Sequence, residues 1–174
     1  MAMNKNLAFI LRMIACGVLV AVCFVLQTSA GTHFTPFGAH IDLLPAIAVC
    51  AGVIMGPSAG MVVGILVGIA YDVAGVQVEG LYPIYYMLCG TIAGVVARYA
   101  LGRTLSTAAL VSLCSVGVLS ILRYLFYFHF DTATASYIYY IRGITAQLLL
   151  MALLVPAAYL LVRLIAGKRS RQAE

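Results

Sequence analysis

The chain has 174 residues, of which 64% are hydrophobic and only 9% are charged, with ten Lys and Arg against five Asp and Glu. Soluble domains average roughly 45–50% apolar and about 25% charged residues. A water-soluble enzyme, a nucleic-acid-binding protein and a disordered chain are excluded, because too few polar side chains are present to cover a surface in water. We therefore expect one polytopic membrane domain over residues 1–174.

Six apolar stretches predict the architecture, since a spanning helix needs about 20 apolar residues to cross a ~30 Å hydrocarbon core. We expect an all-α protein with six transmembrane helices, at about residues 7–27, 41–55, 57–73, 82–101, 106–127 and 137–165. The second and third are short, roughly 23–26 Å each. Because Gly56-Pro57-Ser58 separates them, a tight hairpin is favoured over one continuous helix.

The first stretch has two interpretations. Lys5 and Arg12 precede an apolar run that ends at Gln27-Thr28-Ser29-Ala30, which also fits a cleaved signal peptide. We favour a retained helix, because the run is long enough to span and Arg12 can extend its charged end to the interface.

The basic residues predict the orientation. One side of the membrane receives Lys5, Arg12, Arg98, Arg103, Arg163, Lys168, Arg169 and Arg171, and the opposite side receives only Arg123 and Arg142. Basic residues accumulate on the cytoplasmic side, so both termini are expected in the cytoplasm. The acids follow the opposite distribution, with Asp42, Asp72, Glu79 and Asp131 outside and Glu174 inside.

Aromatic residues gather at the outer boundary, at Tyr82, Tyr85 and Tyr86, in residues 124–130, and at Tyr137, Tyr139 and Tyr140. They form either an anchoring belt in the headgroup layer or the lining of an outward-facing ligand cavity. The five cysteines (Cys16, Cys23, Cys50, Cys89 and Cys114) lie in apolar runs without metal-ligand spacing, so free buried thiols are expected.

Glycines recur every four residues in the third helix, and the fourth helix repeats the spacing. Small residues at this spacing let membrane helices approach closely, so we expect these two helices as a closely packed pair at the centre. The candidate docking groove consists of Gly56, Gly60, Gly64, Gly68, Gly90 and Gly94. Two occupants are open: another helix of the same chain, or the transmembrane helix of a partner.

A second candidate site is an outer charge cluster of Asp42, Asp72, Arg123 and Arg142. Ionisable groups at this depth are costly unless they are paired or wetted. We expect an ion pair of Asp72 with Arg123 or Arg142, with Asp42 as the rival acid. The alternatives are that each group reaches the headgroups separately, or that the cluster recognises a ligand or partner outside.

No pattern indicates catalysis. His33, His40 and His129 are scattered, and no nucleophile–base constellation or phosphate-binding loop occurs. We therefore expect no catalytic residue, cofactor or metal site, and an enzyme acting on lipid is the least supported class.

The order of motifs resembles the rod-shape-determining protein MreD family. Leu26-Gln27-Thr28-Ser29 is similar to the family's first-helix ending, and Asp42-Leu43-Leu44, Gly60-x-x-x-Gly64-Ile65-x-x-Gly68-Ile69-x-x-Asp72, Gly80-Leu81-Tyr82 and Gly90 follow in the family's order. The resemblance covers about residues 7–103. It departs at Pro45, which follows the Asp-Leu-Leu element instead of preceding it.

The resemblance implies a non-catalytic, multi-pass scaffold of the bacterial inner membrane that serves cell elongation and peptidoglycan synthesis. Its implied partners are an MreC-like bitopic membrane protein, a RodA-type polymerase with its transpeptidase, and MreB. The glycine groove would hold the bitopic partner's helix. The basic tail, Lys168 to Arg171, has two candidate contacts, MreB and anionic lipid, of which lipid is favoured. No nucleic-acid partner is expected.

The alternative is the substrate-binding S component of an energy-coupling-factor vitamin transporter. Such chains also have six helices, and some carry a run similar to Gly56-Pro57-Ser58-Ala59-Gly60 followed by Asp72. The outer aromatic residues would then line a vitamin pocket, and Gly17 with Ala21 offers a weak version of the coupling face.

The topology is testable by cysteine labelling in a cysteine-free background. A cysteine at Arg103 should react only from the cytoplasm and one at Glu79 only from outside, because the two loops lie on opposite sides of the expected membrane. Labelling of both from one side would contradict the six-helix topology.

Overall fold

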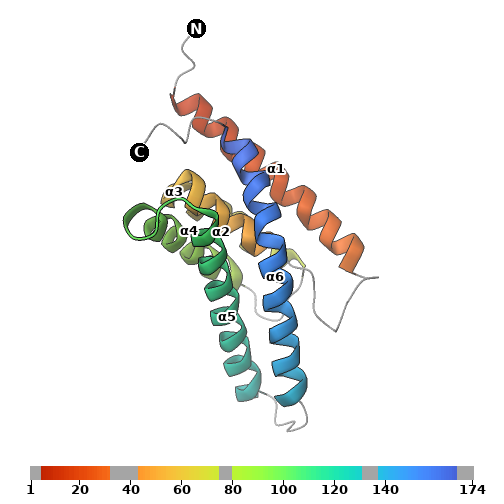
Figure 1. The fold of residues 1–174 in the computed structure, drawn as a ribbon. Helices are drawn as coiled ribbons and strands as arrows, with labels where there is room; N and C mark the ends of the chain where they lie inside the picture. Colours follow the sequence, from red (N-terminus) through yellow and green to blue (C-terminus); the bar gives the residue numbers. More distant parts are fainter. Residues whose placement is uncertain (1–4, 32–42, 75–79, 131–136, 168–174) are drawn as a thin grey trace.

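The structure, a computed structural model, describes residues 5–31, 43–74, 80–130 and 137–167. These residues form helices and connecting turns and contain no strand, so the expected all-α class is confirmed (Figure 1). The helices are α1 (Lys5–Gly31), α2 (Leu44–Met55), α3 (Pro57–Val73), α4 (Leu81–Tyr99), α5 (Leu105–Phe130) and α6 (Tyr137–Ala166).

Among the described residues, three helices are long and apolar enough to cross a membrane. The qualifying segments are Phe9–Ser29 in α1, Leu105–Leu122 in α5 and Gln147–Ala166 in α6. The apolar helices α2 and α3 are shorter. With 12 residues, α2 extends only about 18 Å, well short of a ~30 Å hydrocarbon core.

The connection between α2 and α3 is the tight hairpin that the sequence predicts. Gly56 ends α2 with its N–H donating to the carbonyl oxygen of Gly52, at 2.9 Å. Its φ of 104° lies in the left-handed region, where a residue without Cβ is favoured. Pro57 then opens α3, at a position where the missing proline N–H has no intrahelical partner in any case.

Several helix ends differ from the predicted bounds, and two of these differences fall on residues of the sequence motifs. α2 begins at Leu44, not at residue 41, and Pro45 occupies its first turn, because proline has no N–H to continue a helix backwards. α1 continues through Gly31, so Gln27 and Ser29 lie inside it. The hydroxyl of Thr28 donates to the carbonyl oxygen of Phe24, at 2.8 Å, a bond typical of a threonine within a helix.

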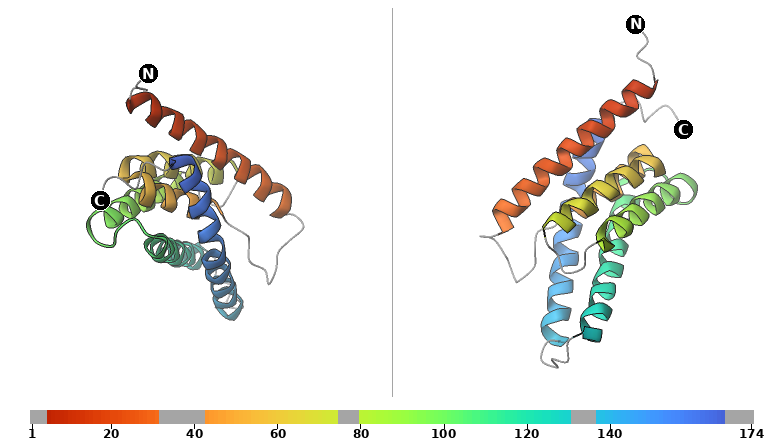
Figure 2. Two further views of the ribbon diagram at one scale, coloured as in Figure 1. Left: turned by 45° about the horizontal axis from the view of Figure 1, so that its top comes forward. Right: turned by 180° about the vertical axis from the view of Figure 1, so that it is seen from behind.

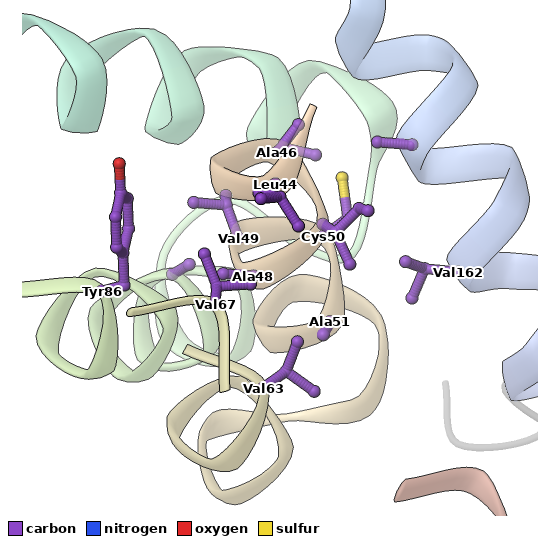
Figure 3. Close-up of a cluster of buried hydrophobic side chains, with 14 of the residues drawn as sticks. Leu44, Ala46, Ala48, Val49, Cys50, Ala51, Val63, Val67, Tyr86 and Val162 are labelled. Atoms are coloured by element: carbon purple, nitrogen blue, oxygen red, sulfur yellow. The ribbon is translucent and has the colours of Figure 1, made fainter. Parts of the chain in front are cut away.

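The helix at the centre is α2, which corrects the expectation that α3 and α4 are central. Residues 44–54 are all buried, and α3, α4, α5 and α6 surround them (Figure 3). Small side chains such as Ala46, Ala48 and Ala51 let neighbours approach α2 from every direction. Since α2 is enclosed by protein, its short length does not expose its ends to lipid.

The other helices each keep an apolar outer face. Large hydrophobic side chains are exposed on all of them, for example Val18 on α1, Ile69 on α3, Ile92 on α4, Val118 on α5 and Leu153 on α6. α1 packs on α3 and α6 at the edge of the molecule, whereas α5 pairs with α6 (Figures 1 and 2). Apolar side chains that face outward this extensively fit a lipid environment better than water.

Candidate functional site

The glycines of α3 and α4 bring the two backbones into direct contact. A Cβ at Gly64 would fall on the carbonyl of Tyr86, a Cβ at Gly68 on the backbone of Pro83, and a Cβ at Gly90 on the carbonyl of Gly60. No side chain larger than hydrogen fits at these positions without moving a backbone. The expected closely packed α3–α4 pair is therefore confirmed.

At the α2–α3 end of this contact, a third helix joins. A Cβ at Gly52 of α2 would fall on the carbonyl of Gly90, and a Cβ at Gly60 would lie 2.7 Å from the Cα of Gly52. Gly52, Gly60 and Gly90 thus form a glycine junction of α2, α3 and α4. Gly52 was not among the predicted groove residues, although it belongs to the same four-residue series.

Gly56 is not part of the packing face, which corrects its inclusion in the groove. A Cβ there would meet no atom within 4 Å, and the residue serves the turn through its positive φ. Its backbone is nevertheless close to α4, because a Cβ at Gly94 would lie 2.5 Å from the nitrogen of Pro57 and 2.8 Å from the carbonyl carbon of Gly56.

The occupant of the predicted groove is thus a helix of the same chain. Gly60, Gly64 and Gly68 face α4, and Gly90 and Gly94 face α3 and its preceding turn. A partner's helix would enter this groove only if α3 and α4 separated. Of the two occupants that the sequence leaves open, the structure contains the intramolecular one.

Next to the α3–α4 contact lies a cluster of stacked tyrosines. The ring of Tyr71 stacks on those of Tyr82 and Tyr86, at centroid distances of 5.6 and 5.3 Å. Tyr82 and Tyr86 are each only 2% exposed. The belt interpretation is wrong for these two residues, because their rings are buried inside the helix bundle and stack on a third tyrosine.

Tyr85 has a different role on the same helix. Its ring meets the edge of Tyr86 at 5.4 Å, and its hydroxyl donates to the backbone carbonyl oxygen of Ser115. This bond joins α4 to α5. The side chains in residues 124–130 and of Tyr137, Tyr139 and Tyr140 lie outside the described part of the structure.

Asp72 joins the end of α3 to the start of α4. One carboxylate oxygen, Oδ2, accepts a hydrogen bond from the N–H of Gly80, at 2.9 Å. Gly80 is the residue that precedes α4, and its φ of 82° is left-handed. The series Gly60, Gly64, Gly68 and Asp72 therefore has two tasks. Its glycines contact α4, and its last residue accepts the hydrogen bond that closes the α3–α4 connection.

The rest of the predicted charge cluster lies outside the described residues. Asp42 is not described, nor are the side chains of Arg123 and Arg142, so the expected Asp72–arginine pair stays a prediction. The same holds for His33, His40 and His129. Among described residues, no three His, Cys, Asp or Glu side chains are close enough together to hold a metal ion.

The cysteines are free, as the sequence predicts. Cys16, Cys23 and Cys50 are buried, whereas Cys89 is partly buried and Cys114 is exposed on α5. The expectation of buried thiols is wrong for Cys114, because an apolar residue of a membrane helix can equally face outward.

Comparisons of the chain with protein families, with curated proteins and with solved structures found no match in any of the three.

The glycine junction predicts a position-specific effect of adding one methyl group. Gly90→Ala should lower the free energy of unfolding by about 1–3 kcal/mol, because its Cβ would overlap the Gly60 carbonyl. The matched control is Gly117→Ala in α5, whose Cβ would meet no atom within 4 Å. Unfolding in detergent micelles measures both, followed by the reaction of a thiol dye with Cys50 in a background where the other four cysteines are replaced. Equal stability of the two variants would contradict the junction.

Asp72 predicts a contrast between two substitutions. Asp72→Asn retains an oxygen that can accept the Gly80 N–H and should cost little, whereas Asp72→Ala should cost about 1 kcal/mol. The same unfolding assay measures both. If Asn is as harmful as Ala, the negative charge itself is required, and a double-mutant cycle with Arg123 or Arg142 then measures the ion pair.

Proposed function

We propose that this chain is a multi-pass protein of the bacterial inner membrane with six transmembrane helices and both termini in the cytoplasm. In this proposal it is a non-catalytic scaffold of the cell-elongation machinery and binds the transmembrane helix of a bitopic, MreC-like protein. Through that partner it assembles with a RodA-type polymerase, its transpeptidase and MreB. The chain binds no cofactor and no nucleic acid.

One observation carries the proposal: the glycine–aspartate motif of α3 meets the Gly80 and Gly90 elements of the MreD-like order in one structural unit, whereas the Leu26–Ser29 element lies in α1. Gly60, Gly64 and Gly68 contact α4, Gly90 contacts Gly60 in return, and Asp72 bonds to Gly80. Motif residues with a shared structural task are expected when a resemblance reflects a common fold. A chance likeness in an apolar sequence would leave them scattered over unrelated positions.

The exposed faces leave room for a partner helix. Because α4 fills the glycine groove, the partner is proposed to pack on an outer apolar face of the bundle. α1 offers the longest such face, with Ile14, Val18, Val22 and Val25 all more than half exposed. Gly17 lies on the other side of α1, where a Cβ would be 3.7 Å from Leu66 of α3.

Photo-crosslinking in living cells tests the proposal. A photoreactive amino acid at one exposed position per helix should capture a single-span cell-wall protein from one face. Suitable positions are Val18 on α1, Ile92 on α4, Val118 on α5 and Leu153 on α6. The matched control is Val63 of α3, which is fully buried and should capture only segments of this chain.

Three results would contradict the scaffold. Capture of a transmembrane coupling protein together with a pair of ATPases would favour the vitamin-transporter alternative. So would a vitamin that stays bound through purification. Depletion of the chain without loss of rod shape would exclude a role in elongation in either case.

A further inference from the structure

Three exposed arginines lie on the segments that meet where the end of α6 contacts the α4–α5 turn, at the opposite end of α4 from Asp72. Arg98 lies in the last turn of α4 and Arg163 in the last turn of α6. Arg103 lies in the turn between α4 and α5. The hydroxyl of Tyr159 donates to the backbone carbonyl oxygen of Arg103, at 3.2 Å, and Arg163 follows Tyr159 by one helical turn. This bond therefore brings the end of α6 to the α4–α5 turn.

The turn that carries Arg103 has a defined geometry. Gly102 has a φ of 74°, and the hydroxyl of Thr107 donates to the carbonyl oxygen of Leu101, at 3.2 Å. The hydroxyls of Thr104 and Thr107 are 2.9 Å apart. These contacts hold the connection against the start of α5, so the backbone at Arg103 has a fixed place.

No described acidic group neutralises these arginines. Asp72 is the only Asp or Glu in the described ranges, and its bond to Gly80 places it at the start of α4. Arg98 is 18 residues further along, about 27 Å by helical rise. The three guanidinium groups are exposed, and Arg98 lies over the ring of Tyr99, 5.6 Å from its centre.

Apolar side chains lie beside the arginines. Leu101 and Leu105 are 50% and 43% exposed, and Leu160 and Leu164, on the same α6 turns as Arg163, are 57% and 78% exposed. Positive groups bordered by exposed leucines match the two parts of a phospholipid, a charged headgroup and acyl chains. A guanidinium also presents its N–H groups in a planar fork that suits phosphate oxygens.

We propose that Arg98, Arg103 and Arg163 form a binding surface for the phosphate headgroup of an anionic phospholipid, named here the arginine surface. The inference rests on the proposed membrane placement, but not on the proposed role in cell elongation. Attraction of a basic side chain to an anionic membrane surface corresponds to about a fivefold increase in affinity per residue.

The absence of tryptophan from the chain permits a direct test. Tyr99→Trp places a single fluorophore beside Arg98, at a side chain that is 77% exposed. The full chain is reconstituted in phosphatidylcholine vesicles that contain a small fraction of either brominated phosphatidylglycerol or brominated phosphatidylcholine. Bromine quenches tryptophan on contact, so the ratio of the two quenching efficiencies reports the preference for the anionic lipid.

Brominated phosphatidylglycerol should quench several-fold more effectively than brominated phosphatidylcholine at equal fractions. R103Q/R163Q should reduce the ratio of the two quenching efficiencies by about fivefold for each arginine removed, or to one if the preference is smaller than that. High salt should also lower the ratio, because it screens the charges. R123Q/R142Q removes the same charge at positions predicted on the opposite side and should keep the preference. If R103Q/R163Q fails to fold, Arg163→Gln alone serves, because this exposed side chain makes no hydrogen bond or ion pair with described residues.

Each of the following results would overturn the arginine surface. Equal quenching by the two lipids would remove the preference while leaving the membrane placement intact. If the preference for the anionic lipid survives in R103Q/R163Q, other residues are responsible for it. If the preference is lost in R123Q/R142Q, it depends on the total charge of the protein and not on the arginine surface. Quenching by neither lipid would place residue 99 outside the bilayer interface and would also contradict the membrane placement. If no lipid preference is found and R103Q/R163Q instead loses a co-purifying acidic protein, the surface binds protein.

Discussion

The contact on which the rest of the structure depends is the direct approach of backbones at Gly52, Gly60 and Gly90. At these positions an added Cβ would fall on the backbone of a neighbouring helix. In a membrane, helices gain little from the hydrophobic effect when they associate, because lipid is as apolar as their side chains. Dense van der Waals contact must supply the attraction, and it is greatest where no side chain separates the backbones.

This contact explains why a helix as short as α2 is tolerated. With about 18 Å of length, α2 could not cover a hydrocarbon core by itself. The glycine junction holds it to α3 and α4, and residues 44–54 are buried as a result. Its backbone groups therefore meet protein and not lipid, which removes the usual requirement for a full-length span. The other helices, including the long α1, α5 and α6, keep exposed apolar faces.

The two ends of the α3–α4 pair differ in chemistry. At one end, the Asp72 carboxylate holds the turn into α4 through Gly80. At the other end, Arg98 and Arg103 are exposed, and the hydrogen bond from Tyr159 to Arg103 brings the end of α6, which carries Arg163, to the same turn. The acid accepts a backbone hydrogen bond, whereas no acidic side chain pairs with the three arginines among the described residues, and Arg98 lies over the ring of Tyr99. The Asp72 carboxylate, which has a hydrogen-bond partner within the chain, is suited to stabilise the fold. The three arginines, which have no acidic partner among the described residues, are suited to bind an anionic group outside the chain.

Much of the fold could be predicted from the sequence by itself. The composition indicated the membrane class, and the apolar stretches predicted the six helices. Gly56-Pro57 predicted the break between α2 and α3, because proline suits a first helical turn and lacks the N–H that a continuing helix needs. The structure adds that Gly56 has a positive φ. The four-residue glycine series predicted the close α3–α4 contact. Each of these signals is local, since it depends on residues within a few positions of one another.

Only the tertiary structure decided which surfaces are inside. In a chain that is apolar on nearly every face, hydrophobicity does not distinguish a face that meets protein from one that meets lipid. Hence the sequence left open whether Gly64 faces a partner or α4, and it placed Tyr82 and Tyr86 at the lipid boundary although they are buried. Burial of α2 on all sides likewise depends on four surrounding helices that are distant along the chain. Which face of each helix is buried therefore depends on the packing of helices that are distant in the sequence, and no local sequence pattern predicts it.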